Sequence, residues 1–230
     1  MITRYSIAIS KEKLQRFYNL DPKGFKPVYN ACPGQILPII KSGNPNKLSF
    51  SEWGLVPADA VDSHIGDKLI NARIKTLEAK KPFDALLPEN RCVILMDSFY
   101  VMTERNAYRI RLKSHEPFTV AGLWDEWGEK ESDKKMFKSF TMITQPASNI
   151  SSQYNDRMPA ILSKDLANVW LSTTNTIDVS ALINAIKPIE RADLELYEVS
   201  LDIKKSSENH ISLLDPLSED GVSTTQGSLF

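Results

Sequence analysis

The sequence predicts a mixed fold in which strands predominate and the helices are few and short. Apolar and polar residues alternate over 108–112, 118–123 and 140–143, which is typical of strands with one buried face. Other short segments place apolar residues at helical spacing. No Gly/Ser-rich or Pro-rich linker interrupts the interior of the chain. These observations together favour one strand-rich domain with several helices at its periphery.

The first expected helices lie at 14–18 and 73–80, where apolar residues recur at helical spacing. Asn71 and Arg73 stand at the start of the second one. Asn71 is then either an N-cap beside a surface arginine, or a polar amide beside a guanidinium that binds phosphate at a helix start. Local chemistry alone leaves both interpretations open.

Residues 91–112 predict a β-hairpin. Its first arm is expected over 92–101, its turn near 104–106, and its returning arm over 108–112. Further along, Ser163 is placed to cap a helix over 164–171. A last helix is expected over 178–186, because Pro188 follows and disfavours helical geometry in the residue before it.

The composition indicates a globular protein with a polar end. The 230 residues are 42% hydrophobic and 25% charged, which allows a sizeable core. From about Lys204, Ser, Glu, Asp, Asn and Thr dominate. We therefore expect a domain over 1–203 and a partly mobile tail over 204–230.

Several functional classes are disfavoured. The apolar runs are far shorter than the roughly 20 residues that span a bilayer, and the first residues carry no export or transit pattern, so a cytoplasmic protein without a membrane partner is expected. Cys32 and Cys92 lack ligand spacing, so buried thiols are expected rather than a metal site. The net charge of −1 means that any contact with DNA must rest on a local basic surface.

Two further features have both a packing and a functional interpretation. Trp53 and Trp124 lie near glycines and can be core residues or stacking platforms for an unpaired base. Asp156 and Arg157 can be an ion pair that anchors a loop, or charged groups at a site. Pro159 fits the first residues of a strand, where its missing N–H does little harm.

Taken in chain order, these segments resemble the abasic-site-processing family, also called the SOS-response-associated peptidase (SRAP) family. The resemblance covers residues 1–200 and implies a compact α+β domain built around a curved, barrel-like antiparallel sheet, with a positively charged cleft for single-stranded DNA. The matching segments are Arg4-Tyr5-Ser6, Tyr29-Asn30-Ala31-Cys32-Pro33-Gly34-Gln35, Trp53-Gly54-Leu55-Val56-Pro57, Asn71-Ala72-Arg73, Arg91-Cys92-Val93-Ile94, Phe99-Tyr100, Ala121-Gly122-Leu123-Trp124, Ile143-Thr144 and Asp156-Arg157-Met158-Pro159-Ala160-Ile161-Leu162.

The resemblance also implies a chemistry from which this chain departs. In the family the initiator Met is removed, and an amino-terminal Cys condenses with the aldehyde of an abasic sugar and closes a thiazolidine, with Glu, His and Asn assisting and no cofactor. Here Ile2, Val101 and Asn155 stand at the Cys, Glu and His positions, and only Asn71 is retained. The bulky Ile2 is also expected to block removal of Met1. Asn155 can hydrogen-bond, but its amide cannot act as an acid or a base.

The resemblance therefore favours a protein that binds single-stranded or abasic DNA without the crosslink. Its expected DNA contacts are Arg4, Asn71, Arg73, Arg157 and Trp53. One alternative is residual crosslinking, lyase or peptidase activity in the SOS response to DNA damage, through the α-amine of Met1 or another residue. The other alternative is a cleft repurposed for a partner that is not DNA. The sequence does not set the oligomeric state.

Other reactive side chains fit the site poorly. Glu104 is three positions beyond Val101, which places it on the opposite face of an extended strand. The nitrogen of Cys32 is in a peptide bond, so this residue cannot close a thiazolidine. The three histidines match no family position and are expected at the surface; they are His64, His115 and His210.

Overall fold

A closed barrel forms the centre of the molecule. The computed structural model describes residues 1–128, 137–147, 150–173 and 178–217. The barrel strands in spatial order are β10 (Phe137–Pro146), β4 (Leu48–Trp53), β3 (Ile36–Lys41), β6 (Arg91–Met96) and β9 (Phe118–Trp127), and β9 pairs with β10 to close the ring. This confirms the expected barrel-like α+β fold. The pairing of β10 with β4 is parallel, so the barrel is mixed rather than purely antiparallel.

Three short strands extend the barrel at one end. Two of them pair with β10, and the third pairs with β9. They are β5 (Asn71–Arg73), β11 (Arg157–Pro159) and β12 (Ile161–Leu162). The helix expected over 73–80 is present as a 3₁₀ helix over Ile74–Ala79, and Asn71–Arg73 before it form a strand parallel to β10. Pairing with β10 outweighs the local helical pattern, so Asn71 is not an N-cap.

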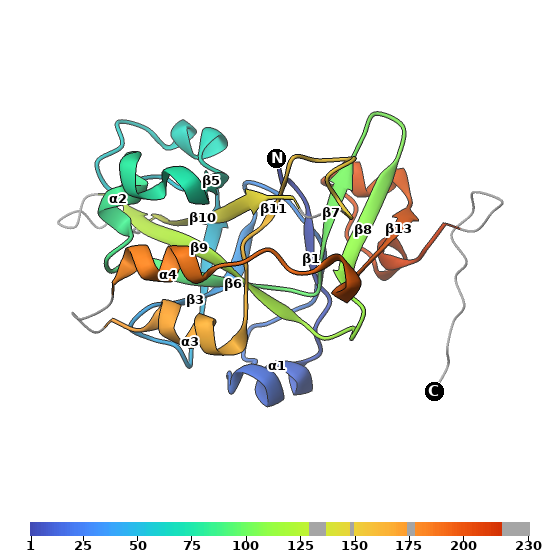
Figure 1. The fold of residues 1–230 in the computed structure, drawn as a ribbon, viewed down its shortest axis with the longest axis horizontal. Helices are drawn as coiled ribbons and strands as arrows, with labels where there is room; N and C mark the ends of the chain where they lie inside the picture. Colours follow the sequence, from blue (N-terminus) through green and yellow to red (C-terminus); the bar gives the residue numbers. More distant parts are fainter. Residues whose placement is uncertain (129–136, 148–149, 174–177, 218–230) are drawn as a thin grey trace.

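A second sheet of five antiparallel strands stands beside the barrel, and Figure 1 shows it to the right of β6 and β9. Its order is β13 (Leu194–Val199), β8 (Ala107–Leu112), β7 (Ser98–Met102), β1 (Tyr5–Ile7) and β2 (Val28–Ala31). The chain passes from the barrel into this sheet at Asp97, between β6 and β7. The expected first hairpin arm over 92–101 is thus two strands in different sheets. Apolar residues on both sides of Asp97 hide the break, and only 98–112 forms a hairpin.

Helices cover the periphery largely as expected. The α-helices are α1 (Lys11–Tyr18), α2 (Phe83–Leu86), α3 (Lys164–Leu171) and α4 (Val179–Ala185). Ser163 accepts a hydrogen bond from the amide of Leu166 and caps α3. The 3₁₀ helices are η1 (Ser63–Lys68), η2 (Ile74–Ala79), η3 (Arg191–Asp193), η4 (Leu201–Lys204) and η5 (Ile211–Leu214). No helix in the described part of the chain is long and apolar enough to cross a membrane.

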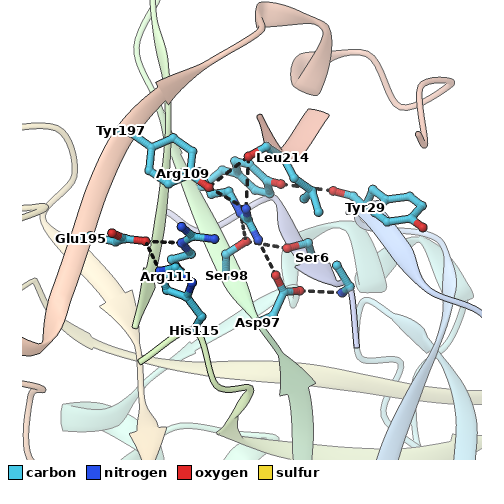
Figure 2. Close-up of polar contacts among 12 residues, drawn as sticks. Ser6, Tyr29, Asp97, Ser98, Arg109, Arg111, His115, Glu195, Tyr197 and Leu214 are labelled. Atoms are coloured by element: carbon cyan, nitrogen blue, oxygen red, sulfur yellow. Dashed lines mark hydrogen bonds and ion pairs between the residues drawn. The ribbon is translucent and has the colours of Figure 1, made fainter. Parts of the chain in front are cut away.

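The segment after Lys204 is packed against the second sheet. Asn209 Oδ1 accepts hydrogen bonds from the amides of Tyr29 at 2.8 Å and Asn30 at 3.2 Å. Leu213 is fully buried, and the carbonyl of Leu214 accepts bonds from side chains of this sheet (Figure 2). Residues 205–217, which were expected in a tail, therefore pack against the domain. The polar composition gave no sign of this packing, because Asn209 and the backbone carbonyls of the segment hydrogen-bond to the domain. Residues 218–230 lie outside the described residues.

Candidate functional site at the amino terminus

The first two residues lie where the barrel meets the second sheet, close to β11 (Figure 1). The amide nitrogen Nδ2 of Asn71 donates to the carbonyl of Ile2 at 2.7 Å. The α-amine of Met1 donates to Oδ1 of Asn155 at 3.0 Å, and Asn155 Nδ2 returns a 3.4 Å bond to the carbonyl of Met1. Two residues that are distant in the sequence, Asn71 and Asn155, therefore hold the amino terminus.

The end of β10 explains why these residues meet. Thr144 is the register partner of both Arg73 on β5 and Pro159 on β11. A strand has two edges, so β5 and β11 must flank β10 on opposite sides. Their arginines, Arg73 and Arg157, therefore come to the same end of the barrel, beside the amino terminus.

The two arginines differ in how their donors are used. Arg157 is half-buried and donates from Nε to Thr144 Oγ1 at 2.9 Å and from Nη2 to the carbonyl of the same residue at 2.5 Å. Arg73 is exposed, and its guanidinium has no hydrogen bond or ion pair within the described ranges. Burial lowers the pKa of Arg157, and the charge of Arg73 lowers it further. No salt bridge joins Arg157 to Asp156, so the ion-pair interpretation is wrong.

The electrostatics of the site act on the α-amine of Met1. Partial burial lowers the pKa of this amine below its usual 8.0, and the positive charges of Arg157 and Arg73 act in the same direction. The carboxylate of Asp156 opposes them. A larger share of the amine is therefore neutral, and nucleophilic, near pH 7 than in a free peptide.

Two residues that the resemblance places at reactive positions are packed in the core. Ile2 is fully buried and Val101 is 1% exposed, and both belong to the apolar core. Cys32 is 4% exposed, and burial raises the pKa of its thiol while Arg4 opposes this. Asn71 Oδ1 is buried and has no partner among the described residues, so Asn71 contacts the amino-terminal backbone through Nδ2 alone.

Two of the expected DNA contacts have structural roles instead. The guanidinium of Arg4 donates to the carbonyls of Thr3, Ile203 and Lys204 at 2.8, 3.2 and 3.0 Å, which ties the amino-terminal segment to η4. Trp53 is fully buried, and its indole donates to the carbonyl of Ile70 at 2.8 Å. A ring with no exposed face cannot stack on a base, so burial contradicts Trp53 as a DNA contact.

The remaining reactive side chains lie outside the site. Glu104 is exposed in the β7–β8 turn. The three histidines are exposed, as expected, and two of them lie beside Glu195 and Glu208. Within the part of the chain that the structure describes, no three His, Cys, Asp or Glu side chains group closely enough to hold a metal ion.

One aromatic feature of the site was not predicted from the sequence. The rings of Tyr108 and Tyr154 stack with centroids 4.2 Å apart. Tyr154 directly precedes Asn155, and this adjacency was the available signal. The partner on β8 is more than forty residues away in sequence, and only the fold brings it there.

This chain is similar to several known proteins. The family model described as "SOS response associated peptidase (SRAP)" matches residues 1–206. The Bacillus subtilis abasic site processing protein YoqW is 34% identical over 225 residues, which cover 94% of this chain and 99% of YoqW. YoaM of the same organism is 37% identical over 201 residues, 84% of this chain and 87% of its own. Abasic site processing protein HMCES of Xenopus tropicalis is 28% identical, with 82% and 66% covered.

Solved structures share the fold. The crystal structure of a protein from Bacteroides thetaiotaomicron superposes with a TM-score of 0.77 at 21% identity and covers 89% of this chain and 95% of that one. A protein from Bordetella bronchiseptica gives a TM-score of 0.75 at 21% identity, with 86% and 100% covered. At this identity the likeness concerns the fold alone.

Proposed function

Because the chain belongs to the SOS response associated peptidase (SRAP) family, we propose that it binds single-stranded DNA at abasic sites through its amino-terminal site, without a stable crosslink. Relatives in several organisms are named abasic site processing proteins. The observation that carries the proposal is the juxtaposition of a partly buried α-amine, the amide of Asn155 and the guanidinium of Arg73.

Each of these groups suits one part of an abasic strand. The free guanidinium of Arg73 can hold a phosphate by charge-assisted hydrogen bonds. The amine of Met1 is a nucleophile for the aldehyde of the open abasic sugar. Asn71 and Asn155 fix the backbone and the amine of the first residues, so the amine is held in place before DNA arrives.

The missing thiol limits the chemistry to a reversible step. The neutral amine of Met1 adds to the aldehyde carbon, and the resulting carbinolamine loses water to give an imine. Closure of a thiazolidine needs a thiol on the residue that carries the amine, and Met1 has a thioether instead. Water therefore returns the imine to amine and aldehyde. Retention of Met1 also moves the free amine one residue outward from the place where a processed chain would carry it.

The alternative of residual enzymatic activity is favoured by one observation, the lowered pKa of the Met1 amine. An amine that is neutral at physiological pH forms imines more readily. We therefore expect transient imine formation to accompany binding. A cleft used by a partner other than DNA has less support, because two arginines and one exposed aspartate surround the amine and the site is not acidic.

A trapping experiment tests the proposal. Purified protein is mixed with a single strand that carries an aldehydic abasic site, with and without borohydride, and intact mass shows that Met1 is retained. We expect a gel shift without reductant, no adduct that survives denaturation, and a covalent band after reduction. A stable adduct without borohydride would contradict the loss of crosslinking. Absence of any gel shift would favour the partner that is not DNA.

Restoring the family residues gives a second test. The triple variant Ile2→Cys, Val101→Glu and Asn155→His is expected to lose Met1 and to form an adduct that survives denaturation without borohydride. Val101 is buried, so the new carboxylate lowers stability, and the double variant without Val101→Glu serves as the folded comparison. If both variants fold, lose Met1 and form no adduct, the geometry of the site does not support this chemistry.

A further inference from the structure

Tyr108 on β8 and Tyr154 in the loop before β11 form a stacked pair at the edge of the amino-terminal site. Their ring centroids are 4.2 Å apart and the ring planes differ by 30°. Both residues are half-buried and rest against the apolar core on one side. Among the described residues the other stacked aromatic pair, Trp53 with Phe140, is fully buried. Of these two stacked pairs, only the tyrosine pair keeps part of its aromatic surface open to solvent.

The fold links this pair to the amino-terminal site through two neighbouring residues. Val101 and Tyr108 are register partners in the β7–β8 hairpin, so their side chains project from the same face of the sheet. Tyr154 precedes Asn155, the residue that accepts a hydrogen bond from the amine of Met1. The amides of Tyr154 and Asn155 both donate to the carbonyl of Ser151, at 2.9 and 2.8 Å, which fixes the two residues in one tight turn.

An exposed aromatic pair can replace the stacking that is lost at an abasic site. The missing base leaves its neighbours in the strand without a stacking partner on one side. Aromatic side chains stack on unpaired bases with little sequence preference, because every base has a π face. The two rings are already in contact, so there is no room for a base between them. A base must stack on an outer face of the pair.

We propose that Tyr108 and Tyr154 form a stacking platform for the nucleobase next to the abasic sugar, while Arg73 holds a neighbouring phosphate. This inference rests on the proposed function, since it assigns a role in DNA binding to side chains at the same site. It gives the site the aromatic contact that the buried Trp53 cannot supply. It also assigns a role to the solvent-exposed part of the tyrosine pair.

A fluorescent base tests the platform. The probe is a short single strand with a tetrahydrofuran abasic analogue and 2-aminopurine on its 5′ or 3′ side, since stacking on an aromatic ring quenches 2-aminopurine. The variants are Tyr108→Leu and Tyr154→Leu, which keep apolar bulk but lose the ring, with Tyr108→Phe and Tyr154→Phe as conservative partners. Phe50→Leu is the matched control, because Phe50 is an aromatic residue on β4 that is 40% exposed.

We expect the leucine variants to lose quenching and to bind the probe on the order of 5- to 150-fold more weakly per stacked base lost. The phenylalanine variants and Phe50→Leu should behave as the unaltered protein. In the unaltered protein, 5-iodouracil at the position of 2-aminopurine should photocrosslink to Tyr108 or Tyr154, which tests the platform even if a leucine variant fails to fold.

The results that overturn the platform differ from those that overturn DNA binding. Leucine variants that bind and quench normally, while Arg73→Glu weakens binding, would remove the platform and leave the proposed function intact. Weaker binding with normal quenching in the saturated complex would also overturn it, because the tyrosines would then only support the loop of Asn155. If the unaltered protein does not bind the probe, the proposed function itself fails.

Discussion

Two arginine-containing regions of the molecule show how the same side chain serves structure in one place and leaves itself available for a ligand in another. Arg109 on β8 is 4% exposed, and every arm of its guanidinium is engaged (Figure 2). It donates to Ser98 Oγ at 2.7 Å and to Asp97 Oδ2 at 2.5 Å. A third arm donates to the hydroxyl of Tyr197 at 2.6 Å and to the carbonyl of Leu214 at 3.1 Å.

Arg73 presents the opposite case. It lies on a three-residue strand at the rim of the barrel and is exposed, and its guanidinium donates to no group within the described part of the chain. Arg4 is engaged like Arg109, because its guanidinium donates to three backbone carbonyls. Arg91 is buried and donates to four carbonyls, those of Leu87, Pro88, Trp170 and Ser172. The number of free donors, and not the residue type, separates a candidate phosphate contact from a structural arginine.

The largest expected effect follows from removing the engaged arginine. Arg109→Met leaves the carboxylate of Asp97 and the hydroxyl of Ser98 without a strong donor in a buried place, so we expect a loss of about 3–5 kcal/mol in the free energy of unfolding. Urea denaturation measures it. Arg111→Met is the matched control, because Arg111 lies two residues further along β8 and pairs with Glu195, and the two side chains are 26% and 31% exposed. Removing this exposed pair should cost about 0–1 kcal/mol in the free energy of unfolding. Equal costs for the two variants would show that burial of the guanidinium does not set its contribution to stability.

Removing the free arginine should act on binding instead of folding. Arg73→Glu is expected to weaken affinity for single-stranded DNA about tenfold and to reduce the slope of log affinity against log salt by about 0.7 or more. Its free energy of unfolding should stay within about 0.5 kcal/mol of the original. Fluorescence anisotropy over a range of salt concentrations measures the first two quantities. Arg16→Glu, an exposed arginine on α1, is the control that should change neither.

A smaller effect is expected from Asn71→Ala. This change removes the 2.7 Å hydrogen bond to the carbonyl of Ile2, a loss of about 0.5–1.5 kcal/mol. It also removes Oδ1, a buried acceptor without a described partner, which offsets part of that loss. Stability should therefore change little, while the first residues lose their anchor and borohydride trapping of abasic DNA falls. A strongly destabilised Asn71→Ala protein with undiminished trapping would show that Asn71 supports the fold and not the site.

The sequence predicted the elements whose signals are local. The helix capped by Ser163 and the strand over 118–123 were correct, because capping and alternation lie within one short segment. The single arm over 92–101 was wrong, and the helix over 73–80 is a 3₁₀ helix that begins only after Arg73. In those segments the partner strand decides the outcome: β10 holds Asn71–Arg73 in a sheet, and the break at Asp97 is fixed by its bonds to Ala8 and Arg109.

The sequence predicted the site correctly only for motif residues whose polar groups are not engaged elsewhere in the fold. Asn71, Arg73 and Asn155 meet at the amino terminus. Arg4 and Trp53 belong to matching motifs as well, but Arg4 donates to carbonyls and Trp53 is buried in the core. Which donors are free depends on segments such as η4, which are remote in sequence. The packing of residues 205–217 was not predicted for a related reason. The groups that hold this segment are backbone carbonyls and one asparagine side chain, which leave no apolar pattern in the sequence.

The subtlest expected effect is a shift in the pH dependence of imine trapping. Burial lowers the pKa of the Met1 amine, so the amine is protonated and unreactive at low pH and becomes neutral as the pH rises through a value below 8.0. Trapping by borohydride should therefore reach half its maximum below pH 8.0. Asn155→Asp places a carboxylate where Oδ1 now lies 3.0 Å from the amine, which favours the protonated form and should move the midpoint to higher pH. Asn168→Asp, at an exposed position on α3, adds the same charge away from the site and should leave the midpoint unchanged. An identical midpoint in all three proteins would mean that the trapped amine is not that of Met1.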